Sequence, residues 1–188
     1  MRHILFFGNS LTAGYGLSNA SRESFPALIQ QKIRDEVLPF EVINGGVSGD
    51  TTAGGLNRLG YWISRPIDTF VLELGINDIM RGIPPAVIYK NLQTIIDRVK
   101  LRYPTVNLAL MGMHLPAFVP VGMMAEFQSV FSKLAATYKM AFVPFFLEGV
   151  MGIRDLNLDD GLHPSAKGYQ IIAEKVWPVL RPLLIAGE

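Results

Sequence analysis

The chain has 188 residues, with 17 lysines and arginines against 16 aspartates and glutamates, and it has no cysteine. This length suits one domain over residues 1–188 whose core needs no disulfides, and the lack of cysteine excludes thiolate chemistry. The balanced, scattered charge argues against nucleic acid as a partner.

The N-terminus runs from Met1 directly into an apolar segment, without the apolar region and small-residue cleavage site of a signal peptide. We therefore expect a cytoplasmic protein, or a periplasmic or secreted one if a leader has been removed. Residues 108–125 are weakly charged but contain His114, two prolines and two glycines, which argues against an integral membrane segment. Nothing in the sequence indicates an oligomeric state.

Apolar, strand-like runs alternate with amphipathic segments of helical length along the chain. The pattern predicts strands at residues 4–7, 41–44, 69–74, 107–111 and 141–143, and helices at 24–38, 52–63, 85–103, 125–139 and 165–184. Because each crossover must return across the sheet, this order predicts a parallel sheet of about five strands with helices on both faces. We expect an α/β fold, a three-layer α/β/α sandwich, with functional residues at the carboxyl ends of the strands.

The first predicted strand ends in a loop with a serine, Gly8-Asn9-Ser10-Leu11. The Ser10 hydroxyl is a candidate nucleophile if a base reaches it, and otherwise a helix cap or turn residue. The glycines here lack the spacing of a dinucleotide-binding loop, and Thr12 stands where the Gly-x-Ser-x-Gly elbow of larger hydrolases has its second glycine. This loop alone leaves the nucleophile and the cap both open.

Two more loops, residues 44–50 and 73–78, follow the second and third predicted strands. Glycine lets the backbone approach a ligand, so the N–H of Gly49, just ahead of a helix, is an expected oxyanion donor. The Asn77 side chain can supply another donor without adding charge. Ser48 is a rival nucleophile in the glycine-rich loop, and either loop could instead be an ordinary capped turn.

Near the C-terminus, Asp160 and His163 stand three residues apart. A serine hydrolase needs an imidazole oriented by a carboxylate, and this spacing allows local geometry to bring the two together. His3 begins a strand and is expected at the surface, whereas His114 follows the fourth strand at the functional edge without an acid at a similar spacing before it. The four loops together supply a nucleophile, a base, an acid and two donors at one edge of the sheet.

Four segments resemble the sequence blocks of the SGNH (GDSL) hydrolases: Gly8-Asn9-Ser10-Leu11, Gly46-Val47-Ser48-Gly49-Asp50, Gly75-Ile76-Asn77-Asp78 and Asp160-Gly161-Leu162-His163-Pro164. Residues 10–16 and 48–51 are most similar to the branch of bacterial arylesterases and the multifunctional thioesterase I/lysophospholipase L1. The resemblance implies a flavodoxin-like fold and no metal or cofactor. It also implies a triad and an oxyanion hole, formed by Ser10, Asp160 and His163 and by the amide of Ser10, Gly49 and Asn77.

Asn9 departs from the family pattern, which usually has an aspartate before the nucleophile. That aspartate is not the triad acid, so we expect Asn9 to keep the hydrogen bonds of the turn and to leave the reaction possible. The missing negative charge should make a developing oxyanion slightly easier to hold.

The expected function is hydrolysis of a small-molecule ester with a short to medium acyl chain, aryl esters included, with thioesters and lysophospholipids as further candidates. Residues 111–124 and 144–153 are rich in Met, Phe and Leu, which suits either an adaptable acyl pocket or a packed core. The expected pocket residues are Asn9, Val47, Ile79, Met113, His114, Leu115, Phe118 and Leu162. The alternatives are a carbohydrate acetylesterase and, in a different class, a flavodoxin-like module that binds a phosphate or flavin ligand.

Overall fold

A five-stranded parallel sheet forms the centre of the structure, a computed structural model that describes residues 1–114 and 121–185. Its strands are β1 (Arg2–Gly8), β2 (Phe40–Gly46), β3 (Thr69–Glu73), β4 (Asn107–Met111) and β5 (Ala141–Val143). Their order across the sheet is β2-β1-β3-β4-β5. This order is that of flavodoxin-like folds, in which ligands bind where the chain turns to opposite sides of the first strand.

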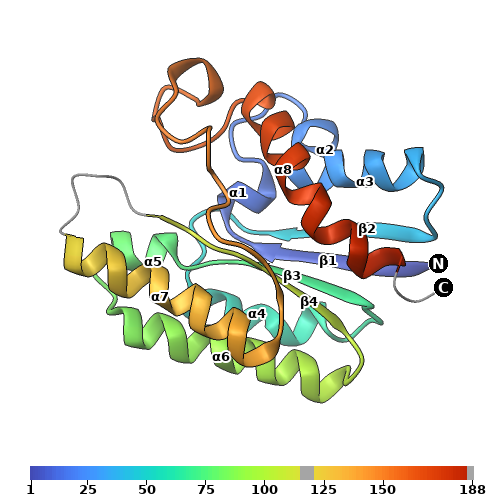
Figure 1. Cartoon of the computed structure of the whole chain (residues 1–188), viewed down its shortest axis with the longest axis horizontal. Coiled ribbons are helices and arrows are strands. Elements are labelled where there is room, and N and C mark those ends of the chain that lie inside the picture. The colour runs from blue at the N-terminus through green and yellow to red at the C-terminus, as the bar shows by residue number, and fades with distance from the viewer. Residues whose placement is uncertain (115–120, 186–188) are drawn as a thin grey trace.

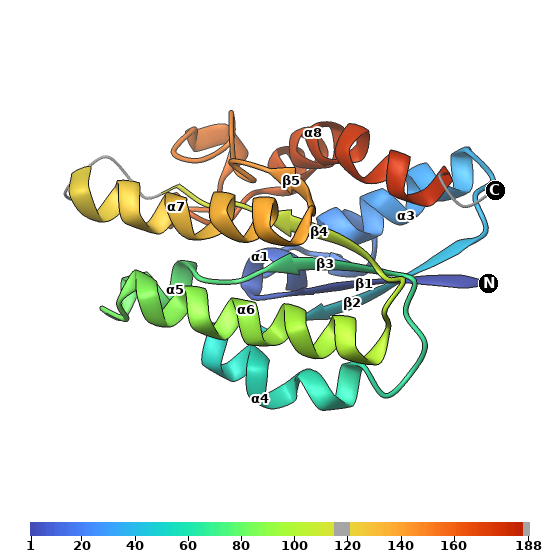
Figure 2. The same ribbon diagram turned by 60° about the horizontal axis from the view of Figure 1, so that its bottom comes forward.

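Helices cover both faces of the sheet, which confirms the expected three layers (Figures 1 and 2). On one face lie α3 (Phe25–Asp35) and α8 (Ala166–Ile185), and on the other lie α4 (Thr52–Trp62), α6 (Pro85–Arg102) and α7 (Val121–Tyr138). Within the described part of the chain, no helix has the length and apolar character needed to span a membrane.

Four short helical elements were not anticipated from the sequence: α1 (Ser10–Ala13), α2 (Ala20–Glu23), α5 (Ile76–Met80) and the 3-10 turn η1 (Arg154–Leu156). Helices of three to five residues are too short to show the 3.6-residue periodicity by which the long helices are recognised. Two of them, α1 and α5, follow strands directly and hold residues of the predicted site.

The central strands are apolar because both faces of a parallel sheet are covered. Every residue of β3 is buried, and Phe6 in β1 is fully enclosed. The Phe6 ring packs edge-on against Phe25 of α3, and Phe25 packs against Phe146 beyond β5. These aromatic contacts join the sheet to the layer that contains α3 and α8.

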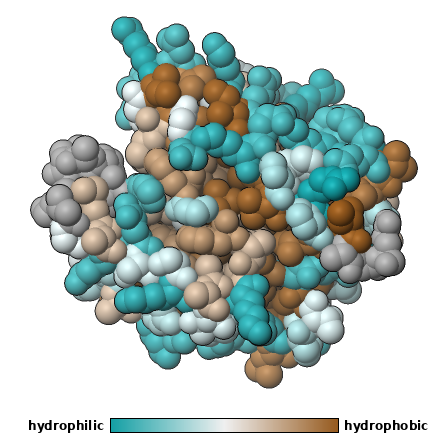
Figure 3. All heavy atoms as spheres, in the orientation of Figure 1, coloured by the Kyte–Doolittle hydropathy of each residue, from teal (hydrophilic) through white to brown (hydrophobic). Residues whose placement is uncertain are grey.

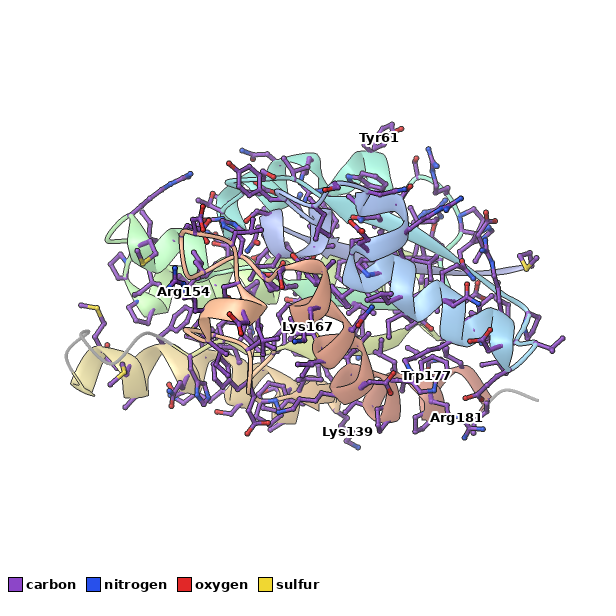
Figure 4. The ribbon with its side chains drawn as sticks, turned by 90° about the horizontal axis from the view of Figure 1, so that it is seen from above. Tyr61, Lys139, Arg154, Lys167, Trp177 and Arg181 are labelled. Atoms are coloured by element: carbon purple, nitrogen blue, oxygen red, sulfur yellow. The ribbon has the colours of Figure 1, made fainter. Side chains whose placement is uncertain are left out.

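Helices α3 and α8 are also joined by polar contacts, which involve the residue directly after α3. Trp177 and Arg181, one turn apart on α8, lie close together in Figure 4. Trp177 Nε1 donates to one carboxylate oxygen of Glu36 at 3.1 Å, and Arg181 Nε donates to the other at 2.7 Å. The C-terminal half of α8 is thereby fastened to the end of α3.

The strand register aligns the ends of β1, β2 and β3, so that the loops that follow them begin side by side. Gly8, the last residue of β1, pairs with Gly46 at the end of β2 and with Glu73 at the end of β3. Figure 1 shows the segment between β5 and α8, in orange, beside α1 at the same edge. In addition, the Tyr169 hydroxyl in α8 donates to the backbone oxygen of Leu11 in α1 at 2.8 Å. Residues distant in sequence therefore meet at one end of the sheet.

Candidate active site

Ser10 is the first residue of α1, and one residue, Asn9, separates it from the end of β1. The helix cap is its neighbour Asn9, whose side-chain oxygen accepts a hydrogen bond from the Leu11 N–H at 2.9 Å. The Ser10 side chain is therefore not used for capping. Its hydroxyl has a long contact, 3.4 Å, to the same Asn9 oxygen and is available for a closer partner. Ser10 is 7% exposed, so a small part of the residue reaches the surface.

The Ser10 hydroxyl lies within hydrogen-bond distance of a histidine from the far end of the chain. Ser10 Oγ and His163 Nε2 are 2.8 Å apart, and His163 Nδ1 and Asp160 Oδ2 are 2.6 Å apart. The chain of contacts runs from hydroxyl to imidazole to carboxylate, which is the arrangement that activates a serine. The structure thus brings together the three residues that the sequence predicted as a triad.

Asp160 is held by the same short segment that it orients. Its Oδ1 accepts the N–H groups of Leu162 and His163, each at 2.9 Å, while Oδ2 faces the imidazole. Partial burial alone would raise the pKa of this carboxyl, but the hydrogen bonds from His163 and Leu162 outweigh that effect and lower the pKa below its ordinary value. Asp160 is therefore ionised at neutral pH and favours the imidazole tautomer with its proton on Nδ1.

Donors for an oxyanion lie beside this triad. Within the described residues, the N–H groups of Ser10 and Gly49 have no hydrogen-bond partner. Asn77 uses one hydrogen of its amide to bind the Asp50 carbonyl at 2.8 Å, which leaves the second hydrogen for a ligand. The loop that holds Gly49 starts next to the nucleophile, because the Val47 N–H donates to the Gly8 carbonyl at 3.0 Å.

Gly49 occupies a backbone conformation that suits glycine. Its φ is +77°, in the left-handed region that side chains with a Cβ rarely adopt. The Gly49 carbonyl accepts a hydrogen bond from Arg81 Nη2 at 2.9 Å, so that peptide is held from the side of α5. These contacts fix the orientation of the loop from which the Gly49 N–H projects.

Arg58, which the sequence analysis did not single out, fastens this loop to the sheet. Its guanidinium donates to Asp50 Oδ2 at 2.6 Å, to the Gly45 carbonyl at 2.8 Å and to the Gly8 carbonyl at 2.9 Å, and it lies over the Phe7 ring. Two of these three acceptors are backbone carbonyls, which leave no signal in a sequence. Arg58 therefore links the ends of β1 and β2 to the segment that follows Gly49.

Asp78 binds the first residue of α4, the helix that follows the same loop. Its carboxylate accepts the Thr52 N–H at 2.9 Å and the Thr52 hydroxyl at 2.5 Å. Burial raises the pKa of Asp78, although the bonds from Thr52 oppose the shift. Asp78 lies next to Asn77, so both residues help to orient the oxyanion loop.

Glu73 is a second acidic residue that the sequence analysis did not assign to the site. Its side chain is 1% exposed at the end of β3 and contacts the turn that contains Ser10. Burial raises the pKa of Glu73 to about 7, against the opposing effect of hydrogen bonds from Thr12 and Asn9. A titratable carboxyl is therefore buried directly behind the nucleophile.

The remaining candidate nucleophile and histidines take no part in this arrangement. Ser48 is exposed, and within the described residues no histidine bonds to it. His3 lies at the opposite edge of the sheet, half-buried and 4.0 Å from the Glu41 carboxylate. His114 stacks on Phe145 with 4.3 Å between ring centroids, and burial lowers its pKa despite the nearby Glu148.

The expected substrate residues fall into three groups. Asn9 and Met113 are buried in the interior, at 0% and 1% exposure, so the expectation that they contact substrate is corrected. Leu115 and Phe118 lie outside the described residues. The others keep some exposed surface at the catalytic edge: Val47, Ile79, His114 and Leu162.

Exposed apolar side chains surround the catalytic edge. The Tyr15 ring packs on His163 with 4.8 Å between centroids and is half exposed. Figure 3 shows hydrophobic side chains gathered towards the centre of the face and at its upper left, over the segment between β5 and α8. Apolar residues with large exposed fractions at this edge include Tyr15, Val47, Met80 and Ile153.

Comparisons with known proteins agree with this geometry. The sequence model of the GDSL-like Lipase/Acylhydrolase family matches residues 6–171. The chain is 37% identical to Esterase TesA of Pseudomonas aeruginosa, over 96% of this chain and 89% of that protein. It is 36% identical to an Arylesterase of Vibrio mimicus, over 92% of this chain and 85% of that protein. A crystal structure of TesA superposes with a TM-score of 0.91 at 36% identity, covering 97% of this chain and all of the other.

Proposed function

The chain belongs to the GDSL-like lipase/acylhydrolase family, and on this premise we propose that it is a serine esterase that hydrolyses carboxylic esters through an acyl-serine intermediate. The observation that carries the proposal is the continuous contact from Ser10 Oγ through the His163 ring to Asp160, at 2.8 and 2.6 Å. The names of the similar proteins, an esterase and an arylesterase, support the same reaction class.

In the first half of the proposed reaction, Ser10 Oγ attacks the ester carbonyl while its proton passes to His163 Nε2. Asp160 stabilises the imidazolium that forms, because its carboxylate faces the protonated Nδ1 at 2.6 Å. The imidazolium then gives its proton to the leaving alcohol or phenol, and the acyl group stays on Ser10.

The negative charge on the carbonyl oxygen needs donors that are already in place. We assign this role to the N–H groups of Ser10 and Gly49 and to the free hydrogen of the Asn77 amide. Arg58 and Arg81 hold the Gly49 loop by its backbone and by Asp50, so the donors need not reorganise during the reaction.

In the second half, water attacks the acyl-serine carbonyl and His163 takes the proton of the water. The same donors stabilise the second oxyanion, and the His163 proton returns to Ser10 Oγ as the acid leaves. Every proton transfer in this scheme passes through Nε2 of His163, which exchanges protons with Ser10, the leaving alcohol and water, so no additional acid or base is required.

The proposed substrates are small-molecule esters with short to medium acyl chains, aryl esters included. The exposed apolar side chains of Tyr15, Val47 and Met80 around the catalytic edge support this choice, because each buried methylene contributes about 0.8 kcal/mol. The comparisons favour neither alternative, since the related proteins carry esterase names rather than those of carbohydrate acetylesterases or flavin-binding modules.

A series of p-nitrophenyl esters from C2 to C12 tests this function. We expect kcat/KM to increase beyond C2 by up to about fourfold for each buried methylene, and then to level off or fall. The Ser10→Ala variant, with an unchanged circular dichroism spectrum, should lose at least about 10³-fold in kcat. Wild-type rates in that variant would contradict the assigned nucleophile, and a monotonic fall from C2 would contradict the acyl-chain preference.

A further inference from the structure

The carboxyl of Glu73 makes all of its hydrogen bonds to the turn that carries the nucleophile. Glu73 Oε1 accepts the Asn9 side-chain amide at 2.8 Å. Glu73 Oε2 accepts the Asn9 backbone N–H at 3.1 Å and the Thr12 hydroxyl at 2.8 Å. Asn9 and Thr12 flank Ser10 in the sequence, and all three side chains of this cluster are buried.

The surroundings give this carboxyl no other partner. Within the described part of the chain, no lysine, arginine or histidine lies within ion-pair distance of Glu73. Two nearby donors serve other acceptors: Arg58 donates to the Gly8 carbonyl, and the buried Tyr169 hydroxyl donates to the Leu11 carbonyl. Gly8 leaves the space for the carboxyl, because a Cβ there would lie 2.6 Å from Glu73 Oε2.

Each end of the Asn9 side chain has a separate task in this cluster. Its amide nitrogen donates to Glu73, and its oxygen accepts the Leu11 N–H at 2.9 Å, which starts α1. If the amide were to turn over, its oxygen would face the Glu73 carboxylate and its nitrogen would face the Leu11 N–H. The Glu73 carboxylate therefore selects the amide orientation that caps α1, and with it the placement of Ser10.

From these contacts we propose that Glu73 is a positioning residue that holds the Asn9–Thr12 turn so that Ser10 Oγ meets His163 and the Ser10 N–H faces the substrate. The proposal rests on the proposed esterase function. It requires that, where the side chains of residues 9 and 73 meet, one of them donates a hydrogen bond and the other accepts it. Which of the two carries the amide does not matter.

Replacing one partner breaks this rule and exchanging both restores it. In Glu73→Gln, the new NH2 group faces either the Asn9 side-chain amide or the Asn9 backbone N–H. In the first orientation two donors oppose each other unless the Asn9 amide turns over and uncaps α1. In the second the Thr12 hydroxyl can rotate and accept, but the Asn9 backbone N–H loses its acceptor. In the double variant Asn9→Asp/Glu73→Gln, the glutamine nitrogen donates to one oxygen of the new carboxylate at position 9, and the other oxygen of that carboxylate caps Leu11. The glutamine oxygen then accepts the backbone N–H at position 9 and the Thr12 hydroxyl, as the Glu73 carboxylate does in the wild type.

The test compares kcat and KM for p-nitrophenyl butyrate in the wild type, Glu73→Gln and the double variant at pH 8, above the raised pKa of Glu73, so that Glu73 is a carboxylate in the wild type. Displacing the nucleophile by about 1 Å is expected to lower kcat of Glu73→Gln about 10²-fold with KM changed less than about threefold. The double variant should recover kcat to within about fivefold of the wild type. Glu41→Gln is the matched control, because it removes the same charge at an exposed position of β2 near the opposite edge.

The outcomes separate this proposal from the proposed function. Wild-type activity that Ser10→Ala abolishes supports the function whatever Glu73→Gln does. A Glu73→Gln variant with kcat within threefold of the wild type overturns the positioning role, and so does a double variant that stays as slow as the single one. If Glu73→Gln does not fold, the double variant decides alone: folded and active, it supports the proposal, and unfolded or inactive, it overturns it.

Discussion

The proposed nucleophile, Ser10, and the proposed base, His163, are held in different ways. Ser10 lies in a turn whose neighbours Asn9 and Thr12 are buried and bonded to Glu73, 61 to 64 residues away in the sequence. His163 lies in an exposed segment, and its orienting acid is only three residues away, with an Asp160 side chain that is 44% exposed. The position of the nucleophile therefore depends on the assembled sheet, whereas the orientation of the base depends mainly on local geometry.

This contrast predicts different effects for mutations in the two halves of the site, the buried half around Ser10 and the exposed half that contains Asp160 and His163. A buried hydrogen-bond network is costly to leave partly unsatisfied, so a change near Ser10 affects both the fold and the chemistry. A local turn at the surface adjusts more cheaply, so a change at Asp160 should affect the chemistry with little effect on the fold. Variants at Asp160, Asn77 and Glu73 test that difference.

The largest effect is expected at the exposed half. Asp160→Asn keeps the shape of the side chain but removes the charge, and it favours the wrong imidazole tautomer, so kcat should fall by roughly 10⁴-fold. Because Asp160 is half exposed, the melting temperature should change little. Steady-state kinetics and thermal melting measure both quantities. A large loss of stability with a small loss of kcat would reverse the contrast between the two halves.

Asn77→Ala tests one of the proposed oxyanion donors. The variant removes one oxyanion donor and also the bond to the Asp50 carbonyl, so kcat should fall about 10²- to 10³-fold. KM should change less, because the donor acts mainly on the charge that develops in the transition state. A matched Asn107→Ala control removes a half-buried asparagine at the start of β4 whose amide also donates to a backbone carbonyl, that of Leu183 at 2.8 Å, away from the site. Equal losses in both variants would contradict the assignment of Asn77 as a donor.

The smallest effect is expected in the pH dependence of stability, and it arises from Glu73 in the buried half of the site. The pKa of Glu73 is raised from 4.5 to about 7 in the folded protein. The folded state therefore binds more protons than the unfolded state between these values. The contribution of Glu73 to the free energy of unfolding is full below the unfolded pKa and is lost as the pH rises through about 7.

Urea unfolding of the wild type and Glu73→Gln between pH 5 and 8 measures this contribution, because the other titrating groups cancel in the difference. The stability of the wild type relative to the variant should decrease as the pH rises, by on the order of 1–3 kcal/mol over the range. A relative stability that is flat or increases with pH would show that Glu73 is already ionised at low pH.

Local patterns indicated the three residues that the structure brings together as a candidate triad, but not the contacts that support them. Asp160 and His163 stand close together in the sequence, and Ser10 follows an apolar run, so each segment carries its own signal. Glu73 is a single acidic residue at the end of a strand, and Arg58 binds two backbone carbonyls, so neither has a distinctive pattern. Their roles become visible only when the register places Gly8 beside both Gly46 and Glu73.

The fold, too, could be predicted from local patterns only in part. The alternation of strands and helices predicted the three layers, and the strands β4 and β5 have the expected bounds. The order β2-β1-β3-β4-β5 is a long-range property that no local segment encodes. Burial likewise could not be foreseen for Asn9 and Met113, because a residue beyond a strand end lies either inside or outside the domain depending on what packs over it.

We propose that the contact with His163 activates the Ser10 hydroxyl. Labelling the folded protein with a fluorophosphonate, followed by mass mapping of the modified peptide, tests this claim most directly, since the reagent reacts with an activated serine. We expect a single modified residue, Ser10, in the wild type and no labelling in His163→Ala. Modification of Ser48 instead, or labelling of Ser10 at an unchanged rate in His163→Ala, would contradict it.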